Sequence, residues 1–291
     1  MLAKQRTISK TKKLNRSKSG NIIINIFLTI MGLFMVLPMV YAISNSLKPL
    51  SELWVYPPRF FVQNPTISNF RDLFTMMNDS WVPFSRYLAN TLFVSIIGTF
   101  GHVIISSLCA YALAKIDFPG RNIIFKIIVL SLMFSAVVTE VPNYYIMSKI
   151  GLIDTHWSII LPAFASSLGL YLMKQFMEAN IPDSLLEAAR IDGAKESTIF
   201  FRLVMPLVKP AWLTLVIFSF QNLWGVTSNS TIRSEQLKSL SYAFSQVVSG
   251  GIARQGASAA ATVIMMIVPI IVFVTTQSSV VETVATSGMK D

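Results

Sequence analysis

Cysteine and histidine are scarce in this sequence. Its 291 residues include one cysteine, Cys109, and two histidines, His102 and His156. A disulfide framework needs pairs of cysteines, and structural zinc sites are built from Cys and His ligands, so both are excluded. The sequence also lacks a Ser/His/Asp set, an HExxH motif and a carboxylate pair within an apolar segment. We therefore expect no catalytic residues, no enzyme activity and no bound metal.

Charged residues are also few. They make up 13% of the chain, whereas apolar residues make up 53%, and the mean hydropathy is +0.59. A soluble domain has about 25% charged residues. The apolar residues gather in charge-free runs of 19 to 29 residues, between Lys18 and Lys48, Arg86 and Lys115, Asp154 and Lys174, Lys209 and Arg233, and Arg254 and Glu282. Because about 20 apolar residues in a helix cross the hydrocarbon core, these runs indicate an all-α polytopic membrane protein.

A sixth apolar segment is shorter than the others. Only the 13 residues 127–139 are free of charge, but a helix over 122–141 reaches the required length if Lys126 extends its ammonium group to the headgroups. We expect six transmembrane helices, at about 22–43, 88–113, 122–141, 156–176, 210–230 and 258–280.

The distribution of Lys and Arg predicts the orientation. Six spans place the segments 1–20, 114–126, 174–209 and 280–291 on one side, and these segments hold 16 of the 24 basic residues. Basic loops stay in the cytoplasm, so we expect both termini inside and the long, proline-rich segment 44–86 outside. The basic tail at 1–20 is then a topology determinant that rests against anionic lipid. The alternative, nucleic-acid binding, has no aromatic or fold signature in its favour.

The segment between the fourth and fifth spans has the most specific pattern. Residues 181–210 read IPDSLLEAARIDGAKESTIFFRLVMPLVKP. Pro182 and Asp183 predict the start of a short helix, with Asp183 or Ser184 as its cap, and Gly193 predicts a left-handed turn after it. A second amphipathic helix with an apolar stripe at 199–204 follows, and Pro206 is expected to end it. A helix–turn–helix between two spans is typical of a surface for a partner.

This loop resembles the EAA loop of permease subunits in ATP-binding cassette importers. The family pattern is EAA, three residues, Gly, nine residues, Ile, one residue, Leu-Pro, and this chain keeps the spacing with Leu for Ile and Met for Leu. Asp192-Gly193-Ala194 resembles the sugar-importer branch. The resemblance implies that the loop docks in an ATPase subunit, through the residues Glu187, Ala188, Ala189, Arg190, Asp192, Gly193, Leu203 and Pro206.

The resemblance to maltose-type permeases extends over about 270 residues, from the basic N-terminus through six spans. The C-terminal tail at 281–291 resembles the tail of the shorter maltose-type subunit, which implies an ATPase-interface role for Thr286, Ser287, Gly288 and Lys290. It further implies a type I importer permease fold in a bacterial cytoplasmic membrane. The implied partners are a second permease, two ATPase subunits and an extracytoplasmic solute-binding protein. This chain has no GxxxxGK[ST] sequence, so ATP and Mg²⁺ are expected on the ATPase alone.

Polar and aromatic residues in or near the expected spans are candidates for a solute path. Amides bind sugar hydroxyls and aromatic faces stack on sugar rings, which favours the residues Glu140, Asn143, Tyr144, Gln221, Asn222 and Trp224. The alternatives are an interfacial aromatic belt for the first three and interhelical packing for the last three. His102 is a further candidate, with a hydrogen bond to a neighbouring helix as its alternative. An ion-coupled carrier would also fit six spans, but it would need carboxylates in mid-span, and Glu140 lies at an edge.

The expected orientation can be tested by labelling single cysteines with an impermeant thiol reagent. With Cys109 replaced by Ser, Asn64→Cys should react in intact cells and Lys195→Cys only after permeabilisation. The reverse pattern would overturn the predicted topology.

Overall fold

The structure is a computed structural model, and it describes residues 18–227 and 230–287. Every regular element in these two ranges is a helix. Four helical segments are long and apolar enough to cross a membrane: Ser19–Ser46, Phe84–Lys115, Trp157–Asn180 and Gln255–Gln277. A fifth is added if Glu196–Leu207 and Lys209–Trp224, bent by 79°, count as one span. The described chain is therefore an all-helical membrane protein with at least four such segments.

The long helices follow the apolar runs of the sequence. They are α1 (Lys18–Ser46), α4 (Phe84–Lys115), α12 (Lys209–Trp224) and α14 (Gln255–Ser287). The fourth expected span contains two helices, α7 (Trp157–Phe164) and α8 (Ser167–Asn180), which are separated by a short break. The remaining described helices are short: α2 (Leu50–Leu53), α3 (Ser68–Asn78), the turn η2 (Glu235–Leu237), α13 (Leu240–Ser249) and the turn η3 (Ile252–Arg254).

The expected span over 122–141 is not one continuous helix. The chain forms α5 (Arg121–Ser131), turns, and starts again as α6 (Ala136–Lys149). Backbone bonds from Leu132, Met133 and Phe134 reach back three residues and tighten the end of α5. Ser135 then accepts a hydrogen bond from the N–H of Val137 and caps α6. The local capping chemistry therefore overrides the apolar pattern that predicted an uninterrupted helix.

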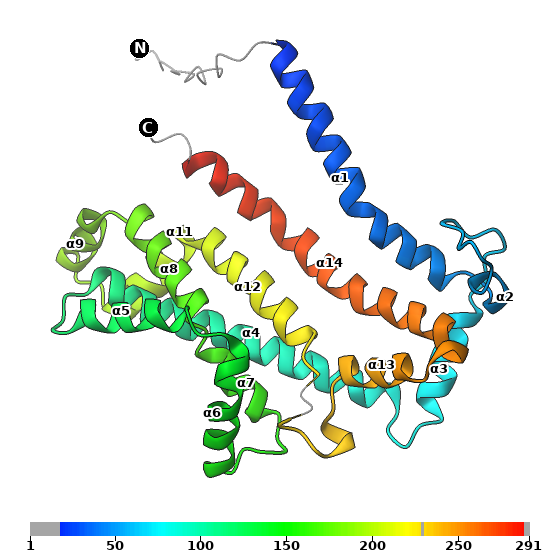
Figure 1. The fold of residues 1–291 in the computed structure, drawn as a ribbon. Coiled ribbons are helices and arrows are strands. Elements are labelled where there is room, and N and C mark those ends of the chain that lie inside the picture. Colours follow the sequence, from blue (N-terminus) through cyan, green and yellow to red (C-terminus); the bar gives the residue numbers. More distant parts are fainter. Residues whose placement is uncertain (1–17, 228–229, 288–291) are drawn as a thin grey trace, which may run out of the picture.

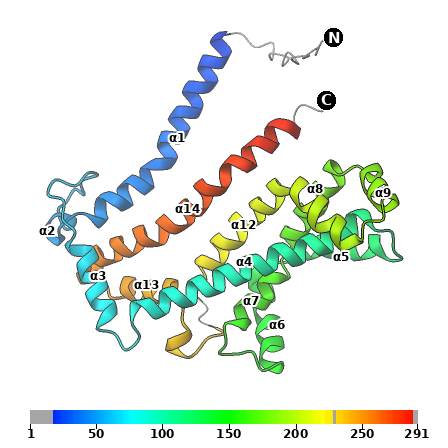
Figure 2. The same cartoon turned by 180° about the vertical axis from the view of Figure 1, so that it is seen from behind.

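Helix α4 is the centre of the molecule. It packs against α7, α8 and α12, while α14 packs along α12 and also contacts α1, α3 and α13. Figures 1 and 2 show the start of α1, the end of α14 and the helix α9 toward one end of the molecule, with α2, α3 and α13 toward the other. Two apolar clusters fill the interior, one between α4, α8, α12 and the cytoplasmic loop, and one between α3, α4, α12, α13 and α14.

Helix α1 has few partners within this chain. It packs against α14, and none of the residues in its most apolar stretch is buried (Figure 1). An apolar helix without protein neighbours faces either lipid or another subunit. This leaves a large apolar surface on the outside of the described chain.

Candidate functional site: the cytoplasmic loop and an outer hollow

The loop between α8 and α12 folds into two helical parts. The first is α9 (Asp183–Ile191), and the second comprises α10 (Glu196–Thr198), the π-helical turn η1 (Ile199–Val204) and α11 (Met205–Leu207). The expectation that Pro206 ends the second helix is wrong by two residues. Pro206 lies near the start of α11, where its missing N–H costs little, and the chain bends at Val208 before α12 begins.

Gly193 supplies the turn after α9. Its φ of +78° is in the left-handed region, and the N–H of Gly193 donates to the carbonyl of Arg190 at 3.0 Å. The N–H of Ala194 donates to the carbonyl of Ala189 at 3.0 Å, which completes a Schellman motif with Asp192 as the C-cap. A side chain with a branched β-carbon is strained at this position. The glycine therefore fixes the angle between the two parts of the loop.

One face of α9 is buried and the other is free. Leu186 is buried in the apolar cluster of the loop, and Ala189 and Leu203 pack against the same cluster. Glu187, Ala188 and Arg190 are exposed, as are Asp192, Gly193 and Pro206. The motif residues therefore divide into those that fasten the loop and those that remain open to a partner.

Ile191 is an exposed apolar residue that the sequence pattern did not single out. It is 86% exposed at the last position of α9, beside the carboxylate-bearing end of the motif. Its place in the apolar periodicity predicted burial, but the helix ends there and the turn at Gly193 points the chain away from the core. An exposed isoleucine next to Ala188 and Glu187 gives the free face of α9 a hydrophobic contact point.

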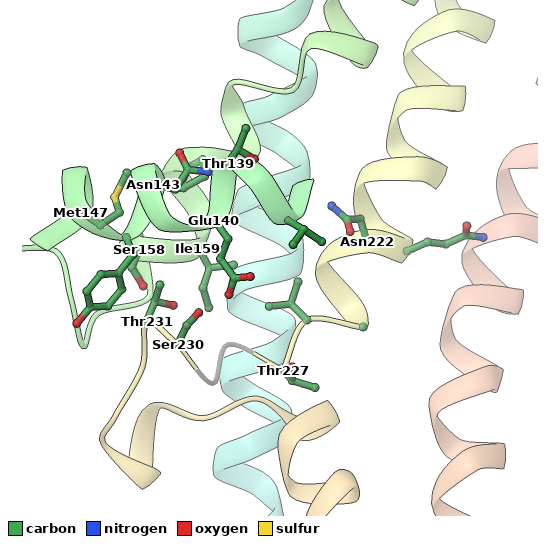
Figure 3. A pocket seen from close by; sticks show the side chains of 16 residues that line it. Thr139, Glu140, Asn143, Met147, Ser158, Ile159, Asn222, Thr227, Ser230 and Thr231 are labelled. Carbon is green, nitrogen blue, oxygen red and sulfur yellow. The ribbon is translucent and has the colours of Figure 1, made fainter. Parts of the chain in front are cut away.

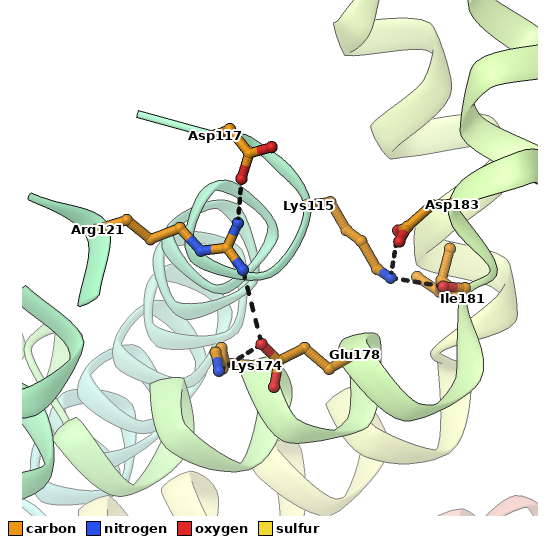
Figure 4. Close-up of polar contacts among 7 residues, drawn as sticks. All are labelled: Lys115, Asp117, Arg121, Lys174, Glu178, Ile181 and Asp183. Carbon is orange, nitrogen blue, oxygen red and sulfur yellow. Dashed lines mark hydrogen bonds and ion pairs between the residues drawn. The ribbon is translucent and has the colours of Figure 1, made fainter. Parts of the chain in front are cut away.

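The loop is fastened to α4 by two groups of contacts, which we name the loop anchors. In the first, the Lys115 ammonium group donates to the Ile181 carbonyl at 2.6 Å and to Asp183 Oδ1 at 2.7 Å (Figure 4). Asp183 thus serves as an ion-pair partner, because the N-cap of α9 is Pro182 and no side chain caps it. The expected capping role of Asp183 or Ser184 is wrong.

The second loop anchor connects three side chains. The Tyr111 hydroxyl donates to Glu196 Oε2 at 2.7 Å, and Arg190 Nε donates to Glu196 Oε1 at 2.7 Å. Arg190 is therefore held within the chain, although it remains exposed. Together with Lys115, this network joins α4 to both ends of α9.

A further ion cluster lies beside the first anchor and involves α5 and α8. Arg121 pairs with Asp117 at 2.7 Å and approaches Glu178 at 3.9 Å, while Lys174 pairs with Glu178 at 2.5 Å (Figure 4). The Lys174 ammonium group also lies 4.0 Å from the centre of the Phe125 ring. These contacts hold α5 against α8 without touching α9.

The candidate path residues gather around an outer hollow of about 840 Å³ between α6, α7 and α12. Glu140, Asn143 and Tyr144 on α6 and Gln221 and Asn222 on α12 all line it. Figure 3 shows that Ser158 of α7 and Thr227, Ser230 and Thr231 after α12 complete the wall. Carboxylate, amide and hydroxyl groups thus converge from elements far apart in the sequence.

Trp224 does not belong to this hollow. It is buried, its indole N–H donates to the Met265 carbonyl of α14 at 3.0 Å, and its ring stacks on Phe220. Of the two roles that the sequence left open for Trp224, the structure supports interhelical packing. Four hydroxyl residues of the wall, Ser158, Thr227, Ser230 and Thr231, were missed, because isolated Ser and Thr residues give no sequence signal.

The rim of the outer hollow is tied together by Asp154. Its Oδ1 accepts hydrogen bonds from the backbone N–H of Arg233 at 2.9 Å and of Ser234 at 2.8 Å. The side chain of Arg233 donates to the Tyr144 hydroxyl at 2.9 Å. Hydrogen bonds from Ser234 lower the pKa of Asp154 below its usual range, so the carboxylate stays ionised at neutral pH. The rim therefore has a fixed geometry next to α6.

The C-terminal candidates are described only in part. The backbone of Thr286 and Ser287 belongs to the last turn of α14, whereas Gly288 and Lys290 lie outside the described residues. Among the residues that the structure describes, no three His, Cys, Asp or Glu side chains are grouped as metal ligands.

The loop anchors should weaken in acid. Hydrogen bonds from Lys115 lower the pKa of Asp183, and hydrogen bonds from Arg190 and Tyr111 lower the pKa of Glu196. Since both pKa values are lower in the folded state, the stabilisation is complete above the ordinary values of about 4 and is lost as the pH falls through the lowered values. Hydrogen exchange of α9 amides should therefore accelerate below about pH 4.

Substitutions should reproduce this loosening at neutral pH. Lys115→Met and Tyr111→Phe should each speed exchange in α9 by roughly two- to tenfold, because each removes hydrogen bonds to the loop. Arg121→Gln is the matched control, since it removes a nearby ion pair that does not touch α9. Equal exchange in all variants would show that these contacts do not hold the loop.

Comparison with known families gives one match over nearly the whole chain. Residues 16–284 match the family described as "Binding-protein-dependent transport system inner membrane component". The match includes every described spanning segment and the whole loop between α8 and α12.

Several characterised relatives are bacterial transport proteins. Protein LplC of Bacillus subtilis is 30% identical over 220 residues, which cover 73% of this chain and 70% of LplC. The arabinooligosaccharides transport system permease protein AraQ of Bacillus subtilis is 29% identical over 230 residues, covering 78% of this chain and 81% of AraQ. The polygalacturonan/rhamnogalacturonan transport system permease protein YtcP of the same organism is 32% identical, covering 68% and 67%.

A solved structure shares the fold. A chain from the crystal structure of a bacterial ABC transporter involved in the import of the acidic polysaccharide alginate superposes with a TM-score of 0.75 at 24% identity. The superposition covers 91% of this chain and 99% of that chain. The chain therefore belongs to the family of binding-protein-dependent transport system inner membrane components, the permease subunits of ABC importers.

Proposed function

We propose that this chain forms half of the translocation path for a sugar or oligosaccharide and that α9 couples it to a separate ATPase by alternating access. The observation that carries the coupling role is the free face of α9. It presents Glu187, Ala188 and Ile191 outward, while the loop anchors and the Schellman turn hold the helix in a fixed orientation. Small side chains permit close approach to a partner, and Glu187 is available to pair with a basic group.

The sugar class is supported by the relatives and by the chemistry of the outer hollow. The names of the relatives include arabinooligosaccharides and polygalacturonan/rhamnogalacturonan, and the structural neighbour takes part in the import of alginate. In this chain, the hollow combines amides and hydroxyls with the Tyr144 ring. Such groups suit a ligand with many hydroxyls.

The proposed partners follow from the surfaces left open. A second permease would cover α1 and close the open side of the outer hollow, so that the path lies between two subunits. Two ATPase subunits would each receive one coupling helix and would bind ATP and Mg²⁺. A related alginate transporter has been solved with a pentasaccharide-bound periplasmic protein, which favours an extracytoplasmic binding protein here.

We further propose six spans in a bacterial cytoplasmic membrane, with both termini inside. The sixth is the interrupted pair α5 and α6, whose break is covered by neighbouring subunits rather than by lipid. An ion-coupled carrier is less consistent with the sequence, because the segments 84–115, 209–224 and 255–277 contain no Asp or Glu. The exposed Glu140 is on the hollow, not in a buried relay.

The coupling role is tested by Gly193→Val and Glu187→Lys. A valine at φ +78° costs about 1–3 kcal/mol and changes the angle of α9. A lysine at position 187 would face a basic partner surface and cost several kcal/mol there. Both variants should insert in the membrane and meet the second permease, but they should retain little ATPase on co-purification and lose sugar uptake.

Gly120→Val is the matched control. Gly120 also has a positive φ, +86°, and space around it, but it lies in the turn between α4 and α5. This variant should keep the ATPase and the uptake. Normal ATPase retention and uptake in Gly193→Val and Glu187→Lys would disprove the coupling role of α9.

The tail forms a separate proposal. We infer that Thr286, Ser287, Gly288 and Lys290 approach the ATPase interface, which the resemblance of the tail supports. Deletion of residues 284–291 should reduce substrate-stimulated ATPase activity of the assembled importer while its membrane insertion is unchanged. Unchanged transport and unchanged stimulation in the truncated complex would refute this role.

A further inference from the structure

A second hollow lies deeper in the subunit, between α4, α5, α8 and α12. It encloses about 860 Å³. Its wall has six residues in common with the outer hollow: Thr139, Asn143, Ile159, Pro162, Asn222 and Val226. The two hollows are therefore continuous, and the inner one extends to the middle of α4 and α12.

The wall of this inner hollow is polar but uncharged. No Asp, Glu, Lys or Arg is among the residues that line it in the described chain. Its polar groups beyond those it has in common with the outer hollow are His102, Ser131, Ser166, Ser167 and Ser219. Phe134 and Phe218 add aromatic surface. Hydroxyls, amides and aromatic faces without a counter-charge suit an uncharged, hydroxyl-rich ligand.

His102 is the residue in this wall that lacks a partner. It is only 4% exposed, and its Nε2 makes no hydrogen bond in the structure. Buried polar atoms of this kind are rare in folded proteins, because water and protein partners are both missing. By contrast, Ser131 is satisfied by the Ile128 carbonyl and by Ser167. The imidazole is thus the group for which the inner hollow still has to provide a partner.

Gly169 keeps the space next to this nitrogen open. A β-carbon at position 169 would lie 2.2 Å from His102 Nε2 and 2.7 Å from Cε1. Gly169 also lines the inner hollow, near the start of α8. Any side chain there would displace the imidazole, so the glycine leaves Nε2 at the wall of the hollow.

We propose that the inner hollow is a second solute subsite, which takes an uncharged sugar unit and uses His102 Nε2 as a hydrogen-bond partner. This proposal rests on the proposed translocation path and names the chemistry of its inner part. A neutral imidazole nitrogen can donate to or accept from a sugar hydroxyl. A uronate or phosphate would enter a hollow whose wall from this subunit offers no cation, and burying an unpaired anion is strongly unfavourable.

The test uses the assembled importer in membrane vesicles, with single cysteines in a Cys109→Ser background. Ser219→Cys reports the inner hollow and Thr227→Cys the outer hollow. Phe100→Cys is the control, because Phe100 lies on α4 outside both hollows and is exposed. Two thiol reagents serve as probes: a neutral glucosyl methanethiosulfonate and the anionic sulfonatoethyl methanethiosulfonate. Rates are divided by those with a small thiol in solution.

At position 219, the neutral reagent should be favoured over the anionic one by about tenfold more than at position 227, because only the inner hollow excludes an unpaired anion. His102→Leu should slow the neutral reagent at position 219 several-fold, and Gly169→Ala should act in the same direction. His102→Gln, which keeps a hydrogen-bonding group, should restore most of the rate. Phe100→Cys should not distinguish the variants.

Three results would overturn the proposal. A Cys at 219 that neither reagent reaches, while a Cys at 227 reacts, would show that the inner hollow is not part of the path. Equal charge preference at both positions would remove the selection for uncharged units, and an unchanged rate in His102→Leu would remove the histidine. If both positions are unreactive, the path through this subunit fails as a whole, whereas ATPase co-purification still tests the coupling role separately.

Discussion

The contacts of Lys115 and Tyr111 with the cytoplasmic loop connect α9 to the spanning part of the molecule. Lys115 is nearly buried at the end of α4 and holds the start of α9, and Tyr111 holds its far end through Glu196 and Arg190. Helix α4 in turn packs against α7, α8 and α12, which surround both hollows. Without these anchors, α9 would be attached only by the flanking chain and by its apolar face.

Much of this arrangement could be predicted from the sequence, where the physical signal was local. The charge-free runs predicted the long helices, because a helix is the economical way to satisfy backbone groups in apolar surroundings. The positive φ at Gly193 followed from the need of a helix C-terminus for a left-handed residue. The clustering of Glu140, Asn143, Tyr144, Gln221 and Asn222 was anticipated because polar groups at membrane depth seek an interior surface.

Where tertiary contacts decide, the sequence was a poorer guide. The apolar pattern at 122–141 does not reveal that Ser135 starts a new helix, and Trp224 resembles a path residue until its indole N–H is seen on the Met265 carbonyl. Exposure of Ile191 depends on where α9 ends. The serines of the inner hollow become a group only when α5, α8 and α12 are brought together.

The loop is joined to the spanning helices at two places, and this has a mechanical consequence. One junction is the set of loop anchors on α4, and the other is the 79° bend at Val208, where the second part of the loop meets α12. Between them, the apolar cluster around Leu186, Phe200 and Val204 packs the loop as one body. Packed interiors transmit displacement rather than absorb it. Under the proposed coupling, a shift of α9 against the ATPase therefore reaches α4 and α12 together. Because residues of α12 line both hollows and His102 of α4 lines the inner one, that shift acts directly on the proposed path.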